Sequence, residues 1–120
     1  MREARVCYNH LAGARGVHLY KSLTSQGFLT VGEAGLNLSP DGESFASAFG
    51  IDLAPLAKAR APMCRECLDW SERQSHLAGG LGRAFLTRME DAGWVRRDPG
   101  SRAMLFGDKG RRAFADAFPV

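Results

Sequence analysis

The stretch CLDWSERQSHLAGGLGRAFLTRMEDAGWV, residues 67–95, decides the fold because half of it also occurs earlier in the chain. His76-Leu77-Ala78-Gly79 matches His10-Leu11-Ala12-Gly13, and Gly93-Trp94-Val95 matches Gly27-Phe28-Leu29 at the same offset. Self-similarity at a constant offset is typical of an internal repeat, which fixes what counts as one structural unit. Each copy reads as a long helix, a glycine that ends it, and an apolar strand.

Length and composition favour one small domain in the cytoplasm. The 120 residues can bury a core without disulfides, and the sequence has no apolar run long enough to cross a membrane. Its three cysteines are an odd number, which favours free thiols or metal ligands over a disulfide framework. We expect a single domain over 1–120, with no membrane partner.

The pattern predicts an α+β fold built from two tandem pseudo-repeats, over about 4–50 and 67–120, with a connector over about 51–66. Each repeat is expected to contain a long helix, a β-hairpin and a short helix, in a winged-helix-like order. The predicted long helices are 2–26 and one that starts at a capping box of Ser71 and Gln74. The other predicted elements are hairpins 28–31/36–38 and 94–97/103–106, a short helix after Ser39-Pro40, a connector helix 51–60, a loop 62–70 and a closing helix 108–118.

Small residues predict where the repeats pack together. Ala12 and Gly16 are four apart, as are Ala78 and Gly82, so each pair would lie on one face of its predicted helix. Small residues at this spacing let two helices approach closely. We therefore expect the two long helices to cross at these residues.

Five cysteine and histidine side chains could carry metal chemistry. Cys7 and His10 would lie one turn apart on the first predicted helix, while Cys67 and His76 come from the second copy. If the helices cross, these four residues could meet and bind zinc, with Cys64 as a weaker fifth candidate. The alternative is structural: buried thiols, with histidines that hydrogen-bond locally to a carboxylate such as Asp69 or Glu72.

Three further groups of residues have candidate roles. Asp69, Trp70, Glu72 and Arg73 form a polar cluster around the predicted start of the second long helix, as a ligand site or as structure. His18 has no evident partner and is expected on the surface. We find no nucleophile elbow, P-loop or dinucleotide motif, and therefore expect no enzyme.

Charge differs between the two predicted hairpins. Residues 94–112 contain six cations and two acids, a balance of +4, whereas residues 28–46 contain three acids and no cation, a balance of −3. A basic hairpin is either an ordinary solvated surface or a site of phosphate contacts. The candidate phosphate contacts are Arg96, Arg97, Arg102, Arg111 and Arg112.

The motifs Cys7-Tyr8-x-His10-Leu11-Ala12-Gly13 and Cys67-Leu68-Asp69-Trp70-Ser71-Glu72-Arg73-x-x-His76-Leu77-Ala78-Gly79 resemble the C-terminal region of bacterial ArsR-like winged-helix transcriptional regulators. The resemblance extends over nearly the whole chain. It implies an N-terminal helix-turn-helix domain as partner, with DNA bound through that domain. It also implies that this region serves dimerisation, as a homodimer, or sensing. Two positions depart from the pattern: Asn9 stands where aspartate is expected, and no cysteine is expected at 64.

Our first hypothesis is therefore a regulatory domain, sensing or dimerising, of an ArsR-like regulator. It needs no cofactor, although zinc is an option. The alternatives are a winged-helix-like module that contacts DNA phosphates through its basic hairpin and a small structural zinc-binding domain. Salt dependence of duplex binding separates the DNA-binding alternative from the others.

Overall fold

The computed structural model describes residues 3–33, 35–60, 62–69 and 73–119. Within these ranges the chain forms five helices and four two-stranded antiparallel hairpins, which confirms the predicted α+β class. The first six elements are β1 (Arg5–Cys7), β2 (His10–Ala12), α1 (Gly13–Ser25), β3 (Leu29–Gly32), β4 (Gly35–Leu38) and α2 (Pro40–Ala48). After α3 (Leu53–Lys58) come β5 (Arg65–Asp69), β6 (Gln74–Ala78), α4 (Gly79–Asp91), β7 (Val95–Arg97), β8 (Met104–Phe106) and α5 (Asp108–Ala117).

Several local predictions are confirmed because turn and cap chemistry is strong at those sites. The Ser39 hydroxyl accepts the Gly42 N–H at 3.0 Å and Pro40 occupies the first position of α2. Gly27 and Gly93, both at φ +77°, follow α1 and α4 in the left-handed conformation that ends many helices. The hairpins β3–β4 and β7–β8 and the closing helix α5 lie where the sequence predicts them.

The predicted starts of both long helices are wrong. Residues 5–12 form the hairpin β1–β2 instead of the first half of a helix, and residues 65–69, predicted as loop, form strand β5. Gln74 lies in β6, while Ser71, the other member of the predicted capping box, lies outside the described residues. The physical reason is visible at Gly13 and Gly79, whose φ values of +77° and +78° do not fit the interior of a right-handed helix, so each helix begins at its glycine.

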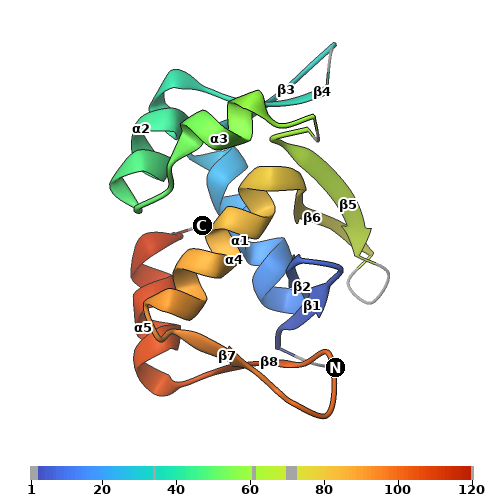
Figure 1. Ribbon diagram of the computed structural model, residues 1–120, viewed down its shortest axis with the longest axis vertical. Coiled ribbons are helices and arrows are strands. Elements are labelled where there is room, and N and C mark those ends of the chain that lie inside the picture. The colour runs from blue at the N-terminus through green and yellow to red at the C-terminus, as the bar shows by residue number, and fades with distance from the viewer. Residues whose placement is uncertain (1–2, 34, 61, 70–72, 120) are drawn as a thin grey trace.

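Each helix packs on the hairpin of the other half. α1 contacts β6, α4 contacts β2, and β2 lies against β6 near the centre of the molecule (Figure 1). The expectation that Gly16 and Gly82 face each other is therefore wrong. A Cβ on Gly16 would lie 3.5 Å from the Cβ of His76, and one on Gly82 would lie 3.4 Å from the Cβ of His10.

One part of the core is a cluster of aromatic side chains from α2, α4 and the end of α5. Phe45 and Phe49 at α2 pack with Phe85 of α4 and Phe118 after α5, and Trp94 meets Phe49 edge to face at 5.5 Å. Stacked and edge-to-face aromatic pairs stabilise beyond their buried area, by about 0.5–1.5 kcal/mol each. This cluster fixes α2, α4 and α5 together, and so holds the frame on which the hairpins lie.

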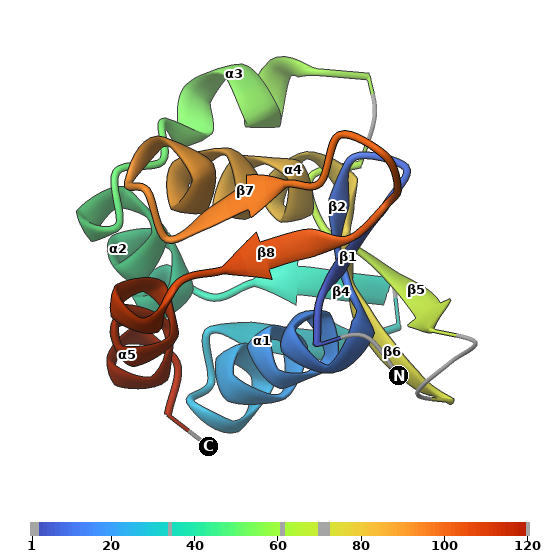
Figure 2. The same ribbon diagram turned by 90° about the horizontal axis from the view of Figure 1, so that it is seen from below.

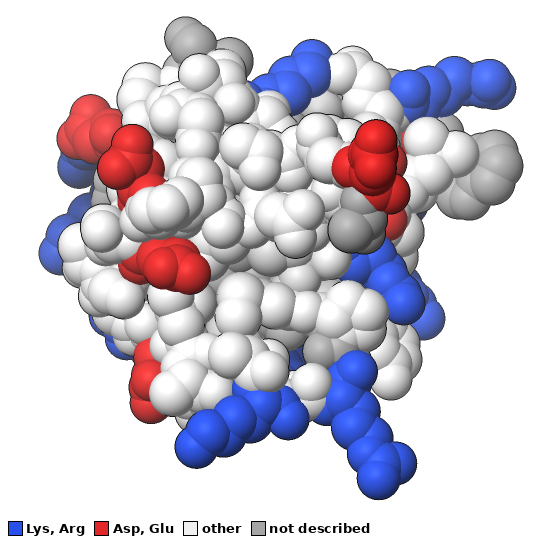
Figure 3. Space-filling view, turned by 90° about the horizontal axis from the view of Figure 1, so that it is seen from above, with Lys and Arg blue, Asp and Glu red and all other residues white. Residues whose placement is uncertain are grey.

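The two differently charged hairpins lie at opposite ends of the molecule. In Figure 1, β3–β4 is at the top and β7–β8 at the bottom, and Figure 2 shows β7 and β8 from below, beside α5. Seen from above, the molecule shows separated acidic groups on a largely uncharged surface, with Lys and Arg side chains around its edge (Figure 3). No helix in the described ranges is long and apolar enough to cross a membrane.

Candidate metal centre

The candidate centre is formed by two cross-strand pairs, one from each central hairpin. Cys7 is opposite His10 in β1–β2, and Cys67 is opposite His76 in β5–β6. Because β2 lies against β6, the two pairs meet, and their four ligand atoms all lie within 4.8 Å of one another. The structure thus brings the four residues together, but through hairpin pairing and not through one turn of a helix as the sequence suggested.

The two histidines are buried and bonded to each other. The Nε2 atoms of His10 and His76 are 2.9 Å apart, and the two residues are only 5% and 1% exposed, respectively. On the far side of the His76 ring, Nδ1 lies 3.2 Å from Oδ2 of Asp69. An ionised carboxylate only accepts, so Nδ1 of His76 carries the proton, and its Nε2 accepts the bond that His10 donates.

Asp69 fixes His76 because it is itself held on several sides. Its Oδ2 accepts the backbone N–H of Gly13 at 2.6 Å, and its Oδ1 lies 3.3 Å from a guanidinium nitrogen of Arg5. Its side chain is fully buried, and charge-assisted bonds of this kind compensate for the lost hydration. A carboxylate behind a histidine, orienting its second nitrogen, is the arrangement typical of metal-ligating histidines.

Burial sets the protonation of the ligands in the metal-free chain. It lowers the pKa of His10 to about 4, with repulsion from His76 adding to the effect. Burial also lowers the pKa of His76, although the Asp69 carboxylate opposes it. The pKa of the Cys67 thiol is raised by burial and then by the neighbouring Cys7. Near neutral pH the cluster thus contains two neutral imidazoles and a protonated Cys67 thiol. Binding of a metal ion would release the thiol proton.

The donor set fits a tetrahedral soft or borderline metal ion. Two sulfurs and two imidazole nitrogens are the ligands of many structural zinc sites, with Zn–S near 2.3 Å and Zn–N near 2.0–2.1 Å. The cysteines are partly exposed and the histidines buried, so an ion would approach from the sulfur side. A bound ion would supply positive charge that favours the thiolate forms of Cys7 and Cys67.

The other predicted site residues are placed less favourably. Cys64 lies outside the cluster, and burial raises its pKa to about 11. Arg73 is exposed at φ +54°, while Trp70 and Glu72 lie outside the described residues. The expectation for His18 is wrong, since its Nε2 lies 2.7 Å from the Phe118 carbonyl oxygen.

The basic end of the molecule is partly neutralised. Arg97 pairs with Glu90 at 3.3 Å, and Arg111 pairs with Glu3 at 3.0 Å and with Asp108 at 3.2 Å. The remaining candidates for phosphate contacts are the exposed side chains of Arg96, Arg102 and Arg112.

Sequence reasoning missed Arg5 and the Gly13 amide, which both bind Asp69. If residues 2–26 were one helix, the Gly13 N–H would bond within that helix and could not bind Asp69. The sequence did contain one signal: a glycine ends both His-Leu-Ala-Gly runs, at Gly13 and Gly79. A glycine repeated at one position can mark a backbone with positive φ, and both residues have it.

One curated relative is named as a transcriptional regulator. Over 111 residues the chain is 42% identical to the uncharacterized HTH-type transcriptional regulator YdfF of Bacillus subtilis (strain 168). The chain is similar to a transcriptional regulator. The match covers 92% of this chain and 49% of YdfF, so the chain spans about half the length of this curated relative. No protein-family model matches the chain, and no solved structure matches it.

Proposed function

We propose that the chain is the regulatory part of an ArsR-like bacterial transcription regulator, and that Cys7, His10, Cys67 and His76 form its metal-sensing site. The observation that carries the proposal is the meeting of four ligand atoms within 4.8 Å, with Asp69 bonded behind His76. The similarity to YdfF supports the regulatory context. The helix-turn-helix domain, and DNA through it, are the proposed partners, and a homodimer is the proposed assembly.

The four residues join the two halves of the fold, which is why a metal there would act as a regulator. Each half contributes one cysteine and one histidine, and each hairpin contacts the long helix of the other half. An ion held by both hairpins stabilises their contact by mass action, because it binds the assembled site and not the separated halves. Metal occupancy would thereby set how firmly α1 and α4 are held.

Metal analysis of protein purified without chelator tests this proposal. We expect about one equivalent of zinc per chain, lost in Cys7→Ser and Cys67→Ser and retained in Cys64→Ser, the matched control whose thiol lies outside the cluster. Cobalt titration should give the absorption of a tetrahedral thiolate site in wild type and in Cys64→Ser. Zinc below about a tenth of an equivalent, with unchanged stability on adding chelator, would leave only a structural role for the four residues.

A second candidate function is favoured by the exposed arginines at the β7–β8 end. Arg96, Arg102 and Arg112 are exposed, and could contact DNA phosphates directly. Titration of a labelled duplex at low and high salt separates this from the first proposal, because phosphate contacts weaken steeply as salt rises. Absence of binding at low salt would remove it.

A further inference from the structure

The chain binds one of its own carboxylates at the start of α1, and this shows how the matching place at α4 would bind a ligand. At α1 the Asp69 carboxylate lies between the guanidinium of Arg5 and the backbone N–H of Gly13. Arg5 is the strand residue opposite Ala12, the last residue before that helix. The internal site therefore consists of an arginine on one strand, a glycine at the first position of the helix, and a carboxylate from elsewhere.

The same frame exists at the start of α4. Arg65 is opposite Ala78 as Arg5 is opposite Ala12, and Gly79 begins α4 as Gly13 begins α1, with φ values of +78° and +77°. The backbone bonds agree as well, since Arg15 N–H donates to the Glu3 carbonyl and Leu81 N–H to the Met63 carbonyl. Arg65 and Gly79 are thus the structural counterparts of Arg5 and Gly13.

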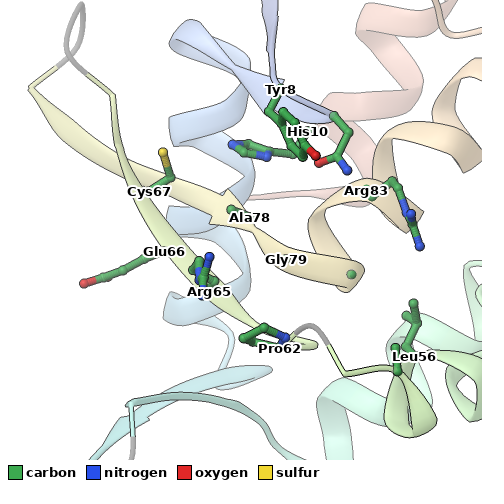
Figure 4. Close-up of a pocket in the computed structure, with 13 residues that line it drawn as sticks. Tyr8, His10, Leu56, Pro62, Arg65, Glu66, Cys67, Ala78, Gly79 and Arg83 are labelled. Atoms are coloured by element: carbon green, nitrogen blue, oxygen red, sulfur yellow. The ribbon is translucent and has the colours of Figure 1, made fainter.

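At this second frame there is a cavity where the first has a carboxylate. Its volume is about 340 Å³, and Arg65, Gly79 and Arg83 line it together with the β1–β2 turn (Figure 4). The turn contributes the neutral amide Asn9 and the exposed ring of Tyr8. Leu56 and Pro62 form an apolar wall on the other side, at the lower edge of Figure 4.

The charge of the cavity is positive and is not balanced by the chain. Within the described residues neither Arg65 nor Arg83 has an ion-pair partner. Glu66 is the acidic residue of the lining, but its side chain is directed away from the cavity in Figure 4, and its Oε2 accepts the Tyr20 hydroxyl at 2.6 Å. Two cations beside an apolar wall favour an anion that has an apolar body.

We propose that this cavity binds a small organic carboxylate, with Arg65 and Arg83 at the carboxylate and Leu56 and Pro62 against its apolar body. The ligand would take at Arg65 and Gly79 the place that Asp69 takes at Arg5 and Gly13. The cavity shares His10 and Cys67 with the cysteine and histidine cluster, but the two arginines that would bind the carboxylate do not belong to that cluster.

Calorimetric titration with benzoate and hexanoate, each paired with its neutral amide, tests the proposal on the protein as purified. At least one acid should bind saturably, and its amide about tenfold or more weakly, because the amide cannot form the charge-assisted pair. If neither acid binds below about 10 mM, a weak limit for a specific small-molecule site, the proposal is overturned. Equal binding of an acid and its amide also overturns it.

Two substitutions locate the site. Arg65→Gln removes a cation, and Asn9→Asp supplies a carboxylate of nearly unchanged shape from the turn that lines the cavity. Each should weaken acid binding about tenfold or more, while Arg102→Gln, an exposed arginine outside the cavity, should leave it unchanged. Wild-type affinity in both Arg65→Gln and Asn9→Asp, with melting temperatures that show both are folded, contradicts the assignment.

Discussion

The hairpins β1–β2 and β5–β6 are alike in their strands and different in their turns. Both place a cysteine opposite a histidine and lead into a helix of 13 residues whose first residue is a glycine with φ near +77°. β1–β2 closes through two residues, Tyr8 and Asn9, whereas β5–β6 is longer by the pairs Leu68–Ser75 and Asp69–Gln74. The longer hairpin thereby carries a carboxylate that the shorter one lacks.

Because of this difference, the second half of the chain supplies a carboxylate that binds residues of the first half. Asp69 of the long hairpin orients His76 of its own half and binds Arg5 and Gly13 of the other half. The short hairpin offers only the amide of Asn9 to the matching position, beside the cavity at Arg65. The backbone is therefore alike at the starts of α1 and α4, but Asp69 fills the anion site at α1, whereas the site at α4 is open to a ligand.

The largest expected effect comes from removing the carboxylate that distinguishes the hairpins. Asp69→Ala leaves the buried His76 Nδ1–H and the Gly13 N–H without their partner, and leaves the Arg5 charge unpaired. Breaking such a buried charged network costs about 3–5 kcal/mol of unfolding free energy. Urea unfolding measures the loss, with Asn9→Ala, at the other turn, as the matched control within about 0.5 kcal/mol of wild type. Equal stability of the two variants would show that the hairpins do not differ in this way.

The second prediction compares α1 and α4 at Gly16 and Gly82, the glycines that pack against the hairpins. A Cβ on Gly16 would overlap the Leu11 carbonyl oxygen, and one on Gly82 would come within 2.7 Å of the Leu77 carbonyl oxygen. Gly16→Ala and Gly82→Ala should each lower the unfolding free energy by about 1–3 kcal/mol through overpacking, although alanine favours helices. Gly100→Ala, where nothing lies within 4 Å, is the control. A rise in melting temperature for both helix variants would contradict the packing.

The third test concerns the pKa of His10, one of the two buried histidines of the cluster. Because the pKa of His10 falls from 6.5 unfolded to about 4 folded, the unfolded chain binds more protons between these values. Acid therefore favours unfolding: the stability contributed by neutral His10 is present above pH 6.5 and is lost as pH falls toward 4, by about 1–3 kcal/mol. Urea midpoints of chelator-treated protein at pH 7 and pH 5 measure this. His10→Gln should reduce the pH dependence, and an unchanged pH dependence in this variant would contradict the assignment to His10.

The smallest effect is expected at a contact that α1 makes and α4 does not. The Tyr20 hydroxyl donates to Glu66 of β5 at 2.6 Å, and burial followed by this bond raises the pKa of Tyr20 to about 12. The residue at the same place in α4 is the buried Leu86. Tyr20→Phe should cost about 0.5–1 kcal/mol. A double-mutant cycle with Glu66→Gln measures the coupling, and fully additive effects would remove the bond as the cause.

The outer elements could be predicted because their signals act locally. Ser39 with Pro40 starts α2, and Gly27 and Gly93 end the long helices, each through the conformation or hydrogen bond of one residue. Such signals do not depend on what lies across the molecule.

The central hairpins could not be predicted because their sequence fits two structures. Cys7-x-x-His10 places its side chains together either on one helical turn or across a two-residue turn, and only tertiary packing selects the second. The four candidate ligands do lie close together, but through a hairpin geometry that the sequence did not predict. The Asp69–His76 bond was one of the expected local contacts, whereas Arg5 could not be found, since its role depends on a strand pairing from the other half.

The exchange of packing partners between the halves also makes each half an incomplete folding unit. α1 covers β6 and α4 covers β2, so a fragment ending near α3 would expose the strand and helix surfaces that β6 and α4 cover in the intact chain. Two complementary fragments cut in that connection should each be unfolded alone and should recover native structure when mixed. The same complementarity would let the first half of one molecule join the second half of another.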